Sequence, residues 1–119
     1  MFPERRKVPR ISVTCKISAS YAERLLVFNT HTEDLSEGGM KVILEQNMHI
    51  PTPVNIELFL GPDKAPFVCK GEVLWVKEVG PLGAPPRMYE TGIKFTGLSV
   101  EDSDKLLNAL AIFAKEKKQ

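Results

Sequence analysis

The chain has 119 residues, of which 43% are hydrophobic and 26% are charged, and its formal net charge is +1. These values are ordinary for a soluble globular protein and argue against the disordered, collagen-like and membrane classes. A chain of this length can bury roughly two-thirds of its unfolded surface in one domain, so it needs neither a disulfide nor a metal to fold.

The first ten residues, MFPERRKVPR, form a basic segment in a nearly neutral chain. Its charged residues are four cations and one acid: Arg5, Arg6, Lys7, Arg10 and Glu4. We expect a flexible arm over residues 1–10 that contacts an anionic partner, although a solvated, frayed terminus is the alternative. The segment lacks the continuous apolar stretch of a secretory signal, and no later window is apolar enough to span a bilayer. The sequence therefore predicts a cytoplasmic protein that does not bind membranes.

Alternation of apolar and polar residues predicts six β-strands, each with one buried face. They are expected at residues 11–18, 24–32, 40–45, 54–60, 67–79 and 88–97. Gly71 interrupts the fifth strand and indicates a bulge or bend that would let a sheet curl into a barrel. Trp75, on the same strand, could line a ligand surface, but packing in the core is the favoured interpretation. The segment GPLGAPPR, residues 80–87, predicts a mobile loop.

The C-terminal segment changes to a helical period. Leu106, Leu110 and Phe113 recur at a helical spacing and predict one amphipathic helix at about residues 100–116. Ser99 and Asp102 have the spacing of a helix-capping pair. We therefore predict an all-β fold over residues 11–119, a six-stranded antiparallel β-barrel with one C-terminal α-helix covering an open end.

The cysteines and histidines show no pattern typical of catalysis or metal binding. Cys15 and Cys69 lie in alternating apolar strands, so buried free thiols are expected. His31 and His49 have no carboxylate or thiol partner at a metal-binding spacing. The sequence therefore predicts a binding module without catalytic residues, metal or cofactor, not an enzyme.

The segment TEDLSEGGMKVIL, residues 32–44, contains more polar chemistry than a connection between strands requires. The Asp34 carboxylate can accept hydrogen bonds from the amide edge of a guanine, and the Ser36 hydroxyl can donate or accept. Gly39 has no Cβ and would allow a flat group to come close. The alternative is a local turn in which these side chains bond only their own backbone.

A second polar motif lies in the segment RRKVPR of the arm. Pro9 disfavours helix at Val8, and in extended chain Arg6 and Arg10 project to the same side. Guanidinium groups grip phosphate through two hydrogen bonds and donate to O6 and N7 of guanine. Taken alone, the segment could equally be an unstructured tail or a weak contact to nucleic acid.

Together the two motifs resemble those of the PilZ domain family, an R-x-x-x-R segment followed by [DN]-x-S-x-x-G. Arg6 and Arg10 match the first motif, with Arg5 giving its doubled-arginine form. The second motif is matched by Asp34, Ser36 and Gly39. The later segments GEVLWV and YETGIKFTGLS are also similar to the family, so that the resemblance covers nearly the whole chain.

The resemblance implies a receptor for cyclic-di-GMP, a bacterial second messenger. Arg6 and Arg10 would clamp a phosphate and the outer edge of a guanine, and Arg5 would stack on a base or grip an intercalated ligand dimer. Asp34 and Ser36 would hold base edges, and Gly39 would make room. Ordering of the arm would change the surface offered to an unidentified downstream protein.

The alternative is a small nucleic-acid-binding barrel that uses the same arm. That protein would tolerate Arg6→Lys and loss of Asp34, and its affinity would fall steeply with salt. The receptor interpretation predicts the reverse for both substitutions and no DNA or RNA partner.

Overall fold

The computed structural model describes residues 12–21, 23–36, 38–60, 65–80 and 87–117. For Tyr21 and residues 113–117 only the backbone is described. The predicted basic arm, with Arg5, Arg6 and Arg10, and most of the predicted 80–87 loop lie outside the described residues.

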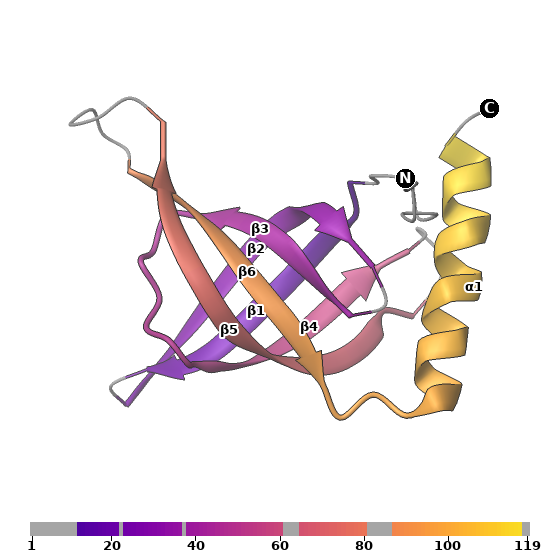
Figure 1. Cartoon of the computed structure of the whole chain (residues 1–119), viewed down its shortest axis with the longest axis horizontal. Coiled ribbons are helices and arrows are strands. Elements are labelled where there is room, and N and C mark those ends of the chain that lie inside the picture. The colour runs from indigo at the N-terminus through magenta and orange to yellow at the C-terminus, as the bar shows by residue number, and fades with distance from the viewer. Residues whose placement is uncertain (1–11, 22, 37, 61–64, 81–86, 118–119) are drawn as a thin grey trace, which may run out of the picture.

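Six antiparallel strands form a closed barrel, as the alternation predicted (Figure 1). The strands are β1 (Thr14–Tyr21), β2 (Arg24–Leu35), β3 (Gly39–Leu44), β4 (Pro53–Phe59), β5 (Phe67–Val79) and β6 (Met88–Thr96). Their order around the barrel is β1-β2-β3-β6-β5-β4, so β3 pairs with β6 instead of with β4, the next strand in the chain.

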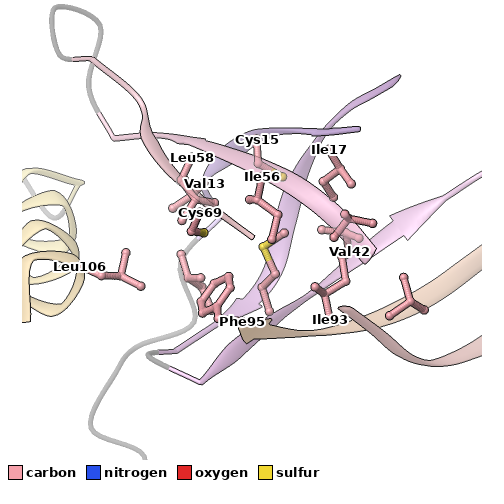
Figure 2. Packing of buried hydrophobic residues seen from close by; sticks show 14 of the residues in the cluster. Val13, Cys15, Ile17, Val42, Ile56, Leu58, Cys69, Ile93, Phe95 and Leu106 are labelled. Atoms are coloured by element: carbon pink, nitrogen blue, oxygen red, sulfur yellow. The ribbon is translucent and has the colours of Figure 1, made fainter. Parts of the chain in front are cut away.

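The barrel interior holds the apolar side chains of the alternating pattern. Ile17, Val42, Ile56 and Val73 are fully buried, each from a different strand. Figure 2 shows side chains from several strands converging in this core. Since burial of each such side chain contributes about 1.5 to 3 kcal/mol, the pattern itself drives closure of the sheet.

The structure corrects two expectations about β5. Gly71 pairs regularly with Val54 on one side and Phe95 on the other, and the register shift instead lies between Val73 and Trp75. A Cβ at Gly71 would lie 2.7 Å from the Ile93 side chain, so this glycine permits close packing.

Trp75 is also not a core residue, because its side chain is on the outer surface and 41% of the residue is exposed. Val73 is buried, and Leu74 is an extra residue between it and Trp75. The inward and outward positions of β5 are therefore exchanged after Val73, and Trp75 faces outward.

One helix, α1 (Val100–Lys117), covers an end of the barrel, as predicted. The Asp102 amide donates to the Ser99 hydroxyl at 3.0 Å, which confirms the predicted cap. Leu106 and Leu110 are buried, and Figure 2 shows Leu106 facing Val13, Leu58, Cys69 and Phe95. The helix therefore closes the apolar interior at this end.

Both cysteines are free and buried, in agreement with the sequence analysis. Burial raises the pKa of the Cys15 thiol to about 12. Burial, with a smaller contribution from the nearby Asp102 carboxylate, raises the pKa of Cys69 to about 11. Both thiols are thus protonated at neutral pH and unsuited to nucleophilic chemistry.

Candidate ligand-binding site

The turn between β2 and β3 carries the Asp34, Ser36 and Gly39 motif. The sequence suggested that strand structure ends at residue 32, but β2 continues to Leu35, and Asp34 is a strand residue opposite Lys41. The register shifts between Thr32 and Asp34, so Glu33 is an extra residue that bends β2 just before the motif.

Three hydrogen bonds hold the turn in place. The Ser36 amide donates to the Gly39 carbonyl at 3.0 Å, and the Gly38 amide donates to the Ser36 hydroxyl at 3.2 Å. The Phe95 amide of β6 donates to the Gly38 carbonyl at 3.0 Å. The bond to Ser36 is the one expected of a local turn, while the bond from β6 ties the turn to the next strand. The motif is therefore held in place by β6 as well as by its own turn. We call residues 34–39 the ledge.

Gly39 has a structural reason to be glycine. A Cβ at this position would overlap the carbonyl oxygen of Ile93 and lie 3.2 Å from the Lys94 Cα. The space that the sequence analysis assigned to a ligand is therefore required first by the backbone of β6. Gly38 has no such restriction, because the nearest atom to a Cβ there is the Ser36 hydroxyl at 4.0 Å.

The described chain begins beside this ledge. The Thr32 amide donates to the Val13 carbonyl at 2.8 Å, and the Val13 amide donates to the buried Thr32 hydroxyl at 3.1 Å. Val13 is thus bonded to Thr32, which precedes Asp34 by two residues in the chain. The segment preceding Ser12 must start from this point.

A row of four positions crosses the outer surface of the barrel from the ledge. In register, Asp34 of β2 lies opposite Lys41 of β3, Lys41 opposite Gly92 of β6, and Gly92 opposite Trp75 of β5. A Cβ at Gly92 would overlap the Trp75 indole, so the ring lies flat over this glycine. With about 4.8 Å between neighbouring strands, the backbones of Trp75 and Asp34 are at most about 14 Å apart across the curved sheet.

Lysines lie along this surface. The Lys41 ammonium is 3.3 Å from the Glu90 carboxylate, and both side chains are largely shielded. Lys94, opposite Gly39 on β6, is exposed. The sequence analysis missed Lys41, Lys94 and Gly92 because their approach to Asp34 depends on strand register. Trp75 was noticed as an aromatic residue but assigned to the core.

Two further properties concern the described residues only. Among them, no group of three or more histidine, cysteine, aspartate or glutamate side chains is arranged to hold a metal ion. Their one helix lacks the length of apolar sequence needed to cross a membrane.

The fold and the turn define a class of small antiparallel barrels, closed by a C-terminal helix and carrying an acid-hydroxyl-glycine turn on the surface. The model of the PilZ domain family matches residues 4–111. The chain therefore belongs to the PilZ domain family. No curated protein sequence matches it.

Solved structures show the same fold at low sequence identity. The PilZ domain with c-di-GMP of YcgR from Escherichia coli has a TM-score of 0.68 and 18% identity, covering 97% of this chain and 95% of that one. K. pneumonia MrkH in its apo state has a TM-score of 0.67 and 16% identity over 98% of this chain, which spans 55% of MrkH. The Borreliella burgdorferi PlzA protein in complex with c-di-GMP has a TM-score of 0.52 and 10% identity, with coverage of 89% and 46%.

Proposed function

We propose that this chain is a receptor for cyclic-di-GMP that binds the ligand between its basic N-terminal segment and the ledge at Asp34. The observation that carries the proposal is the hydrogen-bonded turn of the second PilZ motif. Two residues before Asp34, Thr32 is bonded to Val13, which follows the first motif by three residues. The YcgR and PlzA structures that share the fold contain c-di-GMP.

The chemistry of the ledge suits a guanine. The Asp34 carboxylate accepts from the N1 and N2 donors of the base, and the Ser36 hydroxyl offers a further hydrogen bond. The ligand carries two phosphates, and the exposed Lys94 offers a cation to one of them, whereas Lys41 is already paired with Glu90. The Trp75 indole, at the far end of the row from Asp34, offers a face on which a second base can stack.

The arm contributes guanidinium groups from Arg5, Arg6 and Arg10. Arg10 precedes Val13 by three residues, and a segment of that length reaches about 11 Å at most. Since Val13 is bonded to Thr32, the chain is long enough for the Arg10 guanidinium to contact a ligand at Asp34. Arg6 lies four residues earlier and reaches further over the ligand.

Several contacts are required because ordering the arm is costly. Fixing six residues costs on the order of 6 to 12 kcal/mol if they are free beforehand. A charge-assisted hydrogen bond contributes a net of only about 1.5 to 3 kcal/mol. Paired guanidinium contacts and base stacking together can offset this cost, and the arm then acts as a clamp that closes on the ligand. The clamped arm presents a new surface to a downstream protein, with no catalytic step.

Calorimetric titration of the whole chain with cyclic-di-GMP tests this function and gives the number of ligand molecules bound. We expect Arg10→Ala to abolish measurable heat and Arg6→Lys to weaken binding, because lysine cannot make the two-pronged contact. A single-stranded oligonucleotide serves as the comparison ligand. Oligonucleotide binding that is insensitive to Arg6→Lys, falls steeply with salt and exceeds the response to cyclic-di-GMP would favour the nucleic-acid function.

A further inference from the structure

A partly shielded ion pair lies on the surface that we propose for the ligand. The Lys41 ammonium is 3.3 Å from the Glu90 carboxylate, and only 27% of the lysine side chain and 24% of the glutamate side chain are exposed. Lys41 follows Asp34 in the row that ends at Trp75. A ligand that contacts both ends of the row must therefore pass over Lys41.

This ion pair differs from an ordinary surface pair. Because little of either side chain is open to water, the attraction between the two charges is screened less than in an exposed pair. A lysine ammonium is nevertheless a point charge on a flexible stem, so it can exchange one oxygen partner for another. A phosphate above Lys41 would compete with the Glu90 carboxylate for the same ammonium.

A second lysine lies beside Glu90. Lys77 of β5 is directly opposite Glu90 of β6, and residues opposite each other in an antiparallel pair share a face, with Cβ atoms about 4.5–5.5 Å apart. Lys77 is exposed, and the carboxylate of its neighbour Glu78 lies 3.8 Å from the Arg87 guanidinium. Glu90 therefore has a replacement partner when Lys41 turns away from it.

We infer, resting on the cyclic-di-GMP function proposed above, that Lys41 is a phosphate-binding residue whose ammonium Glu90 holds until the ligand arrives. The ligand carries two phosphates, and the exposed Lys94 offers a cation to one of them. The other phosphate takes the Lys41 ammonium, and the Glu90 carboxylate then pairs with Lys77. Each partly shielded charge keeps an opposite charge beside it, which avoids the cost of an unpaired carboxylate.

Glu90 is a positioning residue in this exchange, because it acts on the ligand only through Lys41. Separating the ion pair opposes binding, so the affinity is lower than an unpaired ammonium would give. An anion that contacts the surface at Lys41 alone gains too little to displace Glu90, whereas a ligand also held by Asp34 and the arm can do so. The ion pair therefore favours an anchored dinucleotide over simple anions.

A double-variant comparison tests the exchange by calorimetric titration of the whole chain with cyclic-di-GMP. Lys41→Gln should weaken binding about tenfold, because a phosphate loses its cation. Glu90→Gln should strengthen binding about threefold, because the ligand no longer has to separate the ion pair. The same change made in a Lys41→Gln chain should leave the affinity within about twofold, since Glu90 acts through Lys41. Lys77→Gln should weaken binding about threefold, because Glu90 then loses its replacement partner.

An exposed ion pair on α1 provides the matched control. The Lys105 ammonium is 3.9 Å from the Glu101 carboxylate, and both side chains are largely open to solvent. Lys105→Gln and Glu101→Gln make the same charge changes outside the row, and each should leave the affinity within about twofold. Urea denaturation should show a single unfolding transition for every variant, so that a change in affinity does not reflect loss of the fold.

The outcomes separate this inference from the function on which it rests. Equal tightening by Glu90→Gln with and without Lys41 would mean that the acid repels the ligand directly, and would overturn the exchange. If Asp34→Ala weakens binding while Lys41→Gln does not, the cyclic-di-GMP function stands and the inference alone fails. A wild-type chain that gives no heat with cyclic-di-GMP overturns the proposed function, and the exchange with it.

Discussion

The two halves of β2 differ in what they offer to a partner. From Thr32 to Leu35 the strand pairs with β3, and Thr32 also bonds Val13 at the start of the described chain. From Arg24 to Asn29, β1 is the one strand among the described residues that pairs with it. The extra residue Glu33 lies close to the change between the halves. The register shift there bends β2 where it pairs with β3.

One strand therefore offers two kinds of surface. In the paired half, the main-chain groups that face β3 are used within the barrel, so a partner would meet side chains there. In the open half, the main chain itself remains available at Leu25 and Val27. Substitutions near the motif should therefore affect folding or ligand affinity, whereas substitutions at the open edge should affect both much less.

The largest effect is expected at Gly39, where the paired half has no space for a side chain. Gly39→Ala places a Cβ against the Ile93 carbonyl and should lower the free energy of unfolding by about 3 kcal/mol, measured by urea denaturation. Gly38→Ala is the matched control and should change it by less than about 0.5 kcal/mol, because the space there is open. Equal losses at the two glycines would mean that the close approach of β6 is not the cause.

The next effect concerns the ligand that we propose for the ledge. Asp34→Ala should weaken cyclic-di-GMP binding about 30-fold, equivalent to about 2 kcal/mol, since it removes a charged acceptor from the base edge. Glu33→Ala removes the adjacent acid, which lies 3.9 Å from exposed His31, and should change the affinity less than about twofold. Similar losses for both variants in a calorimetric titration would indicate a general charge effect and contradict the assigned contact.

A smaller effect on stability is expected at the point where the described chain meets the ledge. Thr32→Val leaves the Val13 amide without its hydroxyl acceptor in a buried position and should cost about 1.5 kcal/mol in unfolding free energy. Thr30→Val, at the border of the open half, removes a long 3.4 Å bond to the Ile43 carbonyl and should cost below about 0.5 kcal/mol. A larger loss at Thr30 than at Thr32 would reverse the proposed difference between the halves.

Much of the fold was predictable from the sequence because burial follows local alternation. Ile17, Val42 and Ile56 are buried where a period of two places them, and α1 begins at its predicted cap. The family motif identified Asp34 and Ser36 before their geometry was known. Their use by this chain remains a proposal, as does the role of the arm.

What sequence reasoning could not supply depends on register between distant strands. Trp75 follows Val73 by two residues and should share its buried face, but the extra residue Leu74 reverses that face. Gly39 is constrained by Ile93, which is far away in the chain and adjacent only after β3 pairs with β6. A bulge and a non-sequential strand pairing have no reliable local signal, so both the outward indole and the row to Asp34 were missed.

The smallest predicted effect tests whether the outward indole belongs to the ligand surface. Trp75→Ala should weaken cyclic-di-GMP binding about fivefold, equivalent to about 1 kcal/mol, because stacking of one base on the ring is lost. Trp75→Phe keeps an aromatic face and should restore most of the affinity, and Leu74→Ala should have no effect on it. If Trp75→Ala binds as tightly as the wild type while Asp34→Ala does not, the ligand covers the ledge without extending along the row to β5.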